Sequence, residues 1–226
     1  MTTKTKKKAA KPNLKSLILK HGSHNRREDG MCVMEAAAYI ANEPHSASPK
    51  CVCPVITTFM INWNDSLPSD AERARLLKPF LPKIIRTKAT PEIEKKRSLK
   101  ALDWLIRTFT PAWLDLVPAC KASAAALRGL AEIVDEVSAA AAREPVLAAQ
   151  KEANAAWAAA RAAAGAAAGD AARAAAWDAV WAAAGDAAGA AAGDAAGDAA
   201  KKALAPTVTT LQSSAGDLLK RMISTK

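Results

Sequence analysis

Aromatic residues are scarce in this chain of 226 residues, which holds three Phe, one Tyr and six Trp. Hydrophobic residues still make up 50% of the sequence, but alanine supplies much of that share and buries little surface per residue. A core must therefore rest on Leu, Ile, Val and Trp, most of which lie between residues 31 and 147. The length allows one large domain or two small ones.

Long apolar runs are also missing, since none approaches the ~20 residues that a membrane-spanning helix needs. Lysines stand at the start of the chain, but no continuous apolar stretch and cleavage site follow them, so we expect no signal peptide. Four cysteines are too few for a disulfide-dense secreted scaffold. These absences predict a cytoplasmic protein, in a cell or in a phage-infected host, with no membrane partner.

Known catalytic motifs are missing too. The sequence holds no Gly-rich phosphate loop, no Gly-x-Ser-x-Gly and no His-Glu-x-x-His. Its three histidines are His21, His24 and His45, so a papain-like order with a histidine far downstream of the cysteine is excluded.

The formal charge of +10 is concentrated at the start of the chain. Residues 1–30 hold nine Lys or Arg and two acidic residues, so most of the net charge lies there. We expect residues 1–20 to form a basic, mostly disordered tail. The run from Lys78 to Lys100 either extends this basic surface or is an ordinary solvated face. Such a tail can bind a polyanion by counterion release, and its candidate residues are Lys4, Lys6, Lys7, Lys8 and Lys11.

Helical spacing and capping patterns recur along the first half of the chain. We expect a helix over residues 31–42 and another over residues 55–65, where length and periodicity also permit a strand. A Ser-x-x-Glu capping box predicts a third helix over residues 69–77. A Thr-Pro pair at residue 90 predicts the start of the next one.

The later helices are expected to be longer. We predict one helix over residues 119–142, with apolar residues along one side, namely Leu127, Leu130, Ile133, Val134 and Val137. Pro206 is expected to open the last helix, which packs back onto the body of the protein.

From residue 157 to residue 201 the sequence repeats every four residues, with Trp, Arg, Gly or Lys in first place and Ala in most others. Four residues overshoot one helical turn by roughly 40°, so one straight helix would present no constant face. Gly-Asp pairs beginning at residues 169, 185 and 193 are typical of helix ends, which favours two or three packed helices over one long helix. The repeat is either an interaction face, or a low-complexity sequence that the protein tolerates because alanine is compatible with a helix.

These patterns predict an all-α protein, a multi-helix bundle with an alanine-rich helical repeat and a disordered basic tail. We expect four parts, in chain order the tail over residues 1–20, a helical body with a Cys/His loop over residues 21–150, the repeat helices over residues 151–202 and the C-terminal helix over residues 203–226.

Three cysteines and a histidine lie within 22 residues, at Cys32, His45, Cys51 and Cys53. Thiolate and imidazole are the usual zinc ligands, so these four residues are a candidate zinc site. The two paired cysteines are separated by one residue, whereas structural zinc sites usually have two.

Two other interpretations of this cluster stay open. Cys32 is a candidate nucleophile, because a helix N-terminus lowers a thiol pKa, with His45 or His21 as the base and Glu35 one turn further on. Otherwise the cysteines are small buried hydrophobic residues and His45 braces a loop. The isolated Cys120 is expected in the core.

Three segments resemble a family of uncharacterised bacterial and phage proteins. They read Asp29-Gly-Met-Cys-Val-Met-Glu-Ala, Glu43-Pro-His-Ser and Cys51-Val-Cys-Pro-Val. The likeness covers most of the chain and includes Trp-Asn-Asp-Ser-Leu-Pro at residues 63–68. The alanine-rich repeats also resemble domains described as immunity proteins, although the repeat here holds more glycine. The resemblance implies no established activity, and suggests a role in phage infection or bacterial conflict.

We therefore expect a non-enzymatic helical interaction protein that binds and occludes a partner. A partner protein is expected, and nucleic acid is a second candidate partner through the basic tail. The rival hypothesis is a zinc protein or a thiol-dependent enzyme centred on Cys32 and His45. The sequence predicts no particular oligomeric state.

Overall fold

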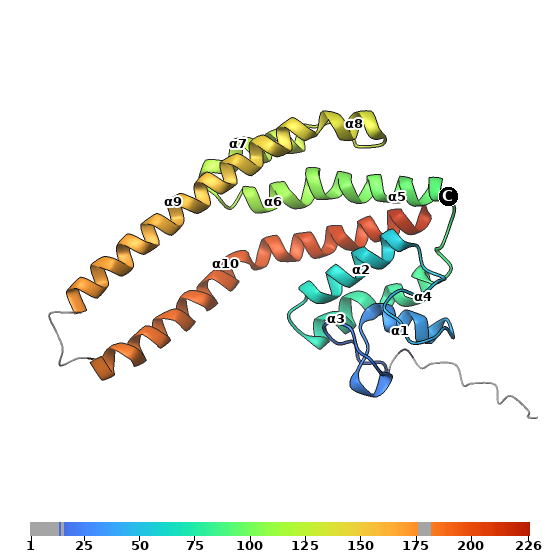
Figure 1. Cartoon of the computed structure of the whole chain (residues 1–226), viewed down its shortest axis with the longest axis horizontal. Coiled ribbons are helices and arrows are strands. Elements are labelled where there is room, and N and C mark those ends of the chain that lie inside the picture. Colours follow the sequence, from blue (N-terminus) through green and yellow to red (C-terminus); the bar gives the residue numbers. More distant parts are fainter. Residues whose placement is uncertain (1–13, 15, 176–181) are drawn as a thin grey trace, which may run out of the picture. The chain divides into compact units, whose positions relative to one another are not determined.

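The computed structural model describes residue 14 and residues 16–175 and 182–226, with side chains except at residue 161 and residues 163–200. All regular elements of this described part are helical, so the all-α prediction is confirmed (Figure 1). The predicted polyanion-binding lysines, Lys4, Lys6, Lys7, Lys8 and Lys11, lie outside it.

The α-helices are α1 (Val33–Ile40), α2 (Pro54–Ser66), α3 (Asp70–Leu77), α4 (Leu81–Ile84), α5 (Pro91–Trp104), α6 (Thr110–Leu114), α7 (Lys121–Arg128), α8 (Glu136–Ala141), α9 (Arg143–Ala175) and α10 (Ala182–Ser224). Short 3₁₀ turns occupy Arg27–Asp29, Lys78–Phe80 and Pro118–Cys120, and a π turn occupies Leu105–Phe109. The described residues contain no helix with the length and apolar character to cross a membrane.

Contacts divide the chain into two compact units. Unit 1 comprises Met1–Ser98 together with Leu219–Lys226, and unit 2 comprises Leu99–Leu218. The boundaries fall within α5 and α10, and not at residues 20, 150 and 202, where the composition of the chain changes.

In unit 1, α1 is a buried helix. All residues from Val33 to Ala38 are buried, because α1 contacts both α2 and α4. Its three consecutive alanines, residues 36–38, take little space and permit this close packing. The side chains of Ile56 in α2 and Leu81 in α4 are fully buried, and each contributes roughly 1.5–3 kcal/mol by leaving water.

Three predicted helix starts in unit 1 are confirmed, whereas the helix expected over residues 31–42 is α1, which begins at Val33 after the N-cap Cys32. Residues 55–65 are helical within α2, which begins with Pro54 at its first position. The Ser69 hydroxyl accepts a hydrogen bond from the backbone N–H of Glu72 at 3.2 Å and caps α3. The Thr-Pro pair at residue 90 is followed by α5 as expected.

In unit 2, one hydrophobic cluster joins α6, α7 and α9 with the segments between them. The isolated Cys120 is fully buried in this cluster, which confirms its expected place in the core. The cluster mixes Leu and Ile side chains with Ala and Cys, and Leu127 and Ile133 are among its most deeply buried members. Its buried residues are Ile106, Leu114, Cys120, Ala124, Leu127, Ile133, Ala142 and Ala149.

The prediction of one helix over residues 119–142 is wrong. Helix α7 ends at Arg128 before Gly129, and the chain is not helical again until α8. The Asp103 carboxylate accepts the backbone N–H of Ile133 at 3.0 Å, and Asp135 then caps α8 in a capping box with Ser138.

This break changes which apolar side chains are buried. Ile133 is buried, whereas Val134 and Val137 are 60% and 79% exposed. The three residues do not share one helix side, because the predicted helical period is broken across residues 129–135. The segment they belong to therefore presents apolar side chains to solvent.

Two further predicted helix boundaries are wrong. Pro206 lies inside α10 and does not open a new helix. The Gly-Asp pairs at residues 169, 185 and 193 lie inside α9 and α10, so they do not end helices there. Alanine has the highest helix propensity, which offsets about 1 kcal/mol per internal glycine and about 3 kcal/mol for the proline. Helix α10 changes direction along its length in Figure 1, as a helix with an internal proline commonly does.

Candidate functional site

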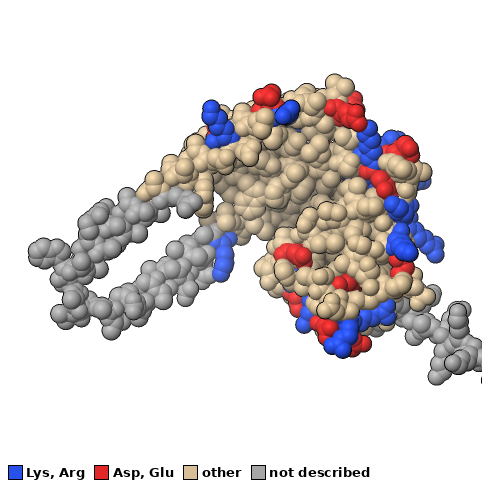
Figure 2. Space-filling model, in the orientation of Figure 1, with Lys and Arg blue, Asp and Glu red and all other residues tan. Residues whose placement is uncertain are grey.

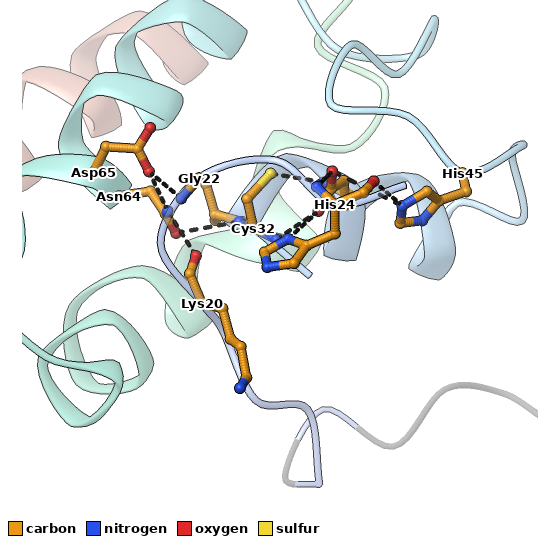
Figure 3. A network of polar contacts seen from close by, with 9 residues as sticks. Lys20, Gly22, His24, Cys32, His45, Asn64 and Asp65 are labelled. Carbon is orange, nitrogen blue, oxygen red and sulfur yellow. Dashed lines mark hydrogen bonds and ion pairs between the residues drawn. The ribbon is translucent and has the colours of Figure 1, made fainter. Parts of the chain in front are cut away.

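Glu35, in the first turn of α1, is the centre of a buried polar network in unit 1 (Figure 3). Its Oε2 accepts the backbone N–H of Cys32 at 2.7 Å, and its Oε1 accepts the backbone N–H of His24 at 2.7 Å. The Nδ1 atom of the His24 ring lies 3.1 Å from Oε2. Both carboxylate oxygens are therefore engaged by N–H donors.

The capping box at the start of α1 places Glu35 in this position. Cys32 is the N-cap residue, and its Sγ accepts the backbone N–H of Glu35 at 3.5 Å. The reciprocal bond runs from the backbone N–H of Cys32 to the Glu35 carboxylate. Ser or Thr usually fills the N-cap position of this motif, and here a cysteine does so.

His45 reaches the same network from the loop after α1. Its Nε2 donates to the backbone carbonyl of His24 at 2.8 Å and lies 3.8 Å from Glu35 Oε1. A carbonyl only accepts, so this bond places a proton on Nε2 of His45. The His45 Nδ1 atom is buried and has no hydrogen-bond partner among the described residues.

A second group of bonds fastens residues 20–22 to the start of α1 and the end of α2. The amide of Asn64 accepts the backbone N–H of Val33 at 3.2 Å and donates to the carbonyl of Lys20 at 2.9 Å. Asp65 Oδ1 accepts the backbone N–H of Gly22 at 2.9 Å (Figure 3). The segment before α1 is thus held at both ends by buried or half-buried side chains.

Glycine is required at position 30, where this segment turns into α1. Gly30 has φ +126°, a conformation that L side chains rarely adopt. A Cβ there would come within 2.7 Å of the Lys20 side chain and 3.1 Å of the His24 ring. The close approach of residues 20–24 to residue 30 therefore depends on the missing side chain.

The electrostatics of Cys32 contradict its predicted role as an activated nucleophile. Burial raises the pKa of the Cys32 thiol to about 11, and the nearby Glu35 charge raises it as well. The backbone N–H groups of Glu35 and Met34 lower this pKa but do not compensate. Cys32 is therefore a protonated, buried N-cap, and the expected effect of the helix N-terminus on its pKa is outweighed.

Glu35 has the opposite balance. Burial alone would raise the pKa of its carboxyl group, but the N–H donors of His24 and Cys32 and the His24 ring hold this pKa below its ordinary value. A buried carboxylate whose lone pairs are occupied in this way orients backbone segments. The predicted catalytic group of Cys32, His45 and Glu35 is brought together, but as a structural network around a protonated thiol.

The predicted zinc ligands are not brought together. Cys51 contacts Glu43, whose carboxylate accepts the backbone N–H of Cys51 at 2.9 Å. Cys53 is fully buried at the start of α2, and its backbone N–H donates to Thr87 Oγ1 at 3.2 Å. No three His, Cys, Asp or Glu side chains in the described part of the chain are placed to hold a metal ion.

The candidate zinc set is corrected accordingly. Cys32 caps α1, His45 bonds to the chain at His24, and Cys51 and Cys53 belong to other contacts. All four cysteines of the chain are free thiols. Burial raises the pKa of the Cys51 thiol, as does its hydrogen bond to the Glu43 carboxylate, so this thiol is not activated either.

The network includes residues that the sequence did not single out as site residues. The Cys-x-x-Glu spacing of Cys32 and Glu35 matches a capping box, and this pattern was available from the sequence. His24 lies 11 residues before Glu35 and Asn64 lies 31 residues after Val33, and no capping or periodic pattern indicates these contacts.

The basic run from Lys78 to Lys100 is only partly a solvated face. Arg97 is buried, and Lys88 pairs with Glu94 at 3.0 Å. On the face drawn in Figure 2, Lys and Arg side chains are interspersed with Asp and Glu and form no single broad patch. Any binding of polyanions by this run must therefore depend on a local group of residues.

Comparison with protein-family models, with curated proteins and with solved structures finds no match to this chain. The resemblance to uncharacterised bacterial and phage proteins therefore stays a prediction.

Proposed function

We propose that this chain is a non-enzymatic interaction protein that binds a partner protein through unit 2 and occludes it. The supporting observation is the distribution of exposed large hydrophobic side chains. Eight of the nine in the described part of the chain belong to unit 2, and the ninth is Ile18. The eight are Leu105, Leu116, Val117, Val134, Val137, Leu147, Trp157 and Leu204.

Trp157 is the strongest candidate contact. Helix α9 packs on the core of unit 2 through small residues, ending with the partly buried Ala153 and Ala156. Trp157 follows directly and is 66% exposed. Tryptophan is enriched among the residues that dominate binding energies, because its ring buries a large area. A partner that covers this ring would extend the packed side of α9.

Val137 provides a second contact of the same kind. It lies in α8, which contacts α9, and it is 79% exposed. Covering such an exposed apolar side chain with an apolar partner surface removes it from water, which favours binding. The partner is accordingly a protein with an apolar surface, which we place in the cytoplasm of a bacterium or of a phage-infected cell.

No observation favours the enzymatic rival. The Cys32 thiol is buried with a raised pKa, which does not favour it as a nucleophile. The role of unit 1 in this proposal is structural, with Glu35 holding the segment around His24 against α1.

The test compares protein capture by immobilised full-length variants in lysate from the source cells. A Val137→Ser/Trp157→Ser variant should lose the captured partner at least tenfold. Ile18→Ser, which changes an exposed apolar residue of unit 1, should retain it. Cys32→Ser keeps an N-cap residue and should also retain it. Equal capture by all variants, or loss with Cys32→Ser, would exclude the proposal.

A further inference from the structure

Arg97 joins three segments of unit 1. Its side chain is buried, and its Nε donates to the carbonyl of Met222 at 2.8 Å. Its Nη1 donates to the carbonyl of Thr87 at 2.5 Å, and its Nη2 donates to that of Thr225 at 3.2 Å. One guanidinium thus fixes the turn after α4, the first half of α5 and the end of α10 in one place.

All three segments carry exposed basic side chains. These bases are the chain neighbours of Arg97 or of the residues whose carbonyls it contacts. Two flank Thr87, one precedes Arg97, one precedes Met222 and one follows Thr225. They are Arg86, Lys88, Lys96, Arg221 and Lys226. The bases are far apart in the sequence and are brought into one region by the buried guanidinium.

The backbone under this basic group is well fixed. Arg86 has φ +66°, a left-handed conformation that is uncommon for a residue other than glycine. The surrounding bonds hold it there, because Lys88 N–H donates to the carbonyl of Cys51 at 3.0 Å and Thr87 is held by Arg97. The exposed bases therefore project from an ordered frame.

The acidic residues of the region only partly neutralise these bases. Glu94 pairs with Lys88 at 3.0 Å, and Glu92 is exposed in the same turn of α5. The basic residues outnumber these acids, so the region keeps a local positive excess. Phosphate groups are the anions that such a spaced set of Lys and Arg binds, through charge and counterion release.

We propose that this basic group, gathered around Arg97, binds the phosphate backbone of a nucleic acid without reading its base sequence. A nucleic acid fits better than an anionic membrane. Binding at a membrane surface by a helical protein usually adds inserted apolar side chains, and Ile18 is the exposed large hydrophobic residue of the described part of unit 1. The region has no exposed aromatic ring to stack on bases, which agrees with contact to the backbone alone.

The experiment measures binding of the full chain to a short fluorescent DNA duplex of arbitrary sequence by anisotropy, over a series of salt concentrations. The test variant is Arg86→Glu/Lys96→Glu/Arg221→Glu, at three exposed positions of the group. Its matched control is Lys121→Glu/Arg143→Glu/Lys151→Glu, which makes the same charge change at exposed positions of unit 2. A third variant replaces Lys4, Lys6, Lys7, Lys8 and Lys11 by Ala, so that binding by the start of the chain is measured separately.

The test variant should bind at least tenfold more weakly at low salt than the control. The slope of log K against log salt should become shallower by about 0.9 for each phosphate that the variant no longer neutralises. Equal weakening in test variant and control would overturn the proposal, as would wild-type protein that binds phosphatidylserine vesicles but not the duplex. If the test variant melts at a lower temperature than the control, the same three residues are replaced by Gln instead of Glu. The expected and the contradicting results stay the same for that variant.

Discussion

A carboxylate can remain charged inside a protein only if N–H donors replace its water. Glu35 satisfies this condition with donors from two residues, His24 and Cys32, and these hold its pKa below the ordinary value of 4.5. Because the folded-state pKa lies below that of the unfolded chain, the stabilisation is complete above about pH 4.5 and is lost as the pH falls through the lowered value.

Glu35→Gln should therefore lower the free energy of unfolding by about 2–3 kcal/mol at pH 7, because one amide oxygen cannot replace two carboxylate oxygens. The difference from wild type should shrink below pH 4.5. Urea unfolding followed by circular dichroism from pH 3 to pH 7 measures both effects. Glu28→Gln, at an exposed position of the same unit, is the control and should change little. A difference that stays constant down to pH 3 would show that the charge of Glu35 is not the cause.

Thiol chemistry gives a second test at this scale. With a pKa of about 11, roughly one Cys32 thiol in a thousand is ionised at pH 8, and the side chain is buried as well. In native protein at pH 8, iodoacetamide should modify the half-exposed Cys51 before Cys32, Cys53 and Cys120, which are all buried. Peptide mass spectrometry after timed labelling gives the order. Selective early modification of Cys32 would restore the nucleophile hypothesis.

At the scale of helices and turns, the sequence predicts a boundary well where the capping residues are local and strong. Ser69 and the Thr-Pro pair at residue 90 mark their helices correctly, since a cap acts within one turn. The break after α7 is missed when the hydrophobic period is followed from residue 119 to residue 142. Gly129 follows the last residue of α7, and Asp135 caps α8, so both residues mark the break. The bond from Ile133 to Asp103 that holds this break comes from another helix and leaves no local trace.

The end of α10 depends on a residue of α5. The last carbonyls of a helix have no partner within it, and here Arg97 supplies donors to Met222 and Thr225. A positive charge is also favourable at a helix C-terminus. Arg97→Ala should cost about 1.5–3 kcal/mol for each charged bond that it removes and should speed amide hydrogen exchange in residues 219–224 about tenfold.

Lys96→Ala is the matched control for amide exchange in residues 219–224, because Lys96 is the exposed residue directly before Arg97 in α5. It should leave exchange near the wild-type rate. If Arg97→Ala and Lys96→Ala gave the same rates, the guanidinium would not be what secures the end of α10.

At the scale of the whole molecule, proximity in the sequence is a poor guide to the site. Cys32, His45, Cys51 and Cys53 are close in the chain, yet only Cys32 and His45 reach the Glu35 network, whereas Cys51 and Cys53 make other contacts. The residues that do meet, such as His24, Glu35 and Asn64, come from segments separated by up to 40 residues. Such contacts arise from tertiary packing, for which no spacing rule exists. The all-α class was predictable because it depends on composition and period alone.

The same scale yields a prediction about cooperativity. The hydrogen bonds of Glu35 to His24 and Cys32 stay within unit 1, as does the burial of α1 against α2 and α4. Asp103 has the corresponding place in unit 2, where it accepts bonds from Ile133 and Arg107 at 3.0 Å each. Removing either carboxylate should therefore loosen its own unit first, because the donors left unpaired belong to that unit.

Amide hydrogen exchange with mass spectrometry of the full chain tests this directly. Glu35→Gln should speed exchange in residues 33–66 and leave residues 121–156 near the wild-type rate, whereas Asp103→Ala should do the reverse. The two variants are controls for each other, since each removes a buried carboxylate that accepts backbone N–H bonds. If either substitution accelerated both peptide sets equally, the chain would open as one cooperative body. The division of the chain into two units would then carry no energetic meaning.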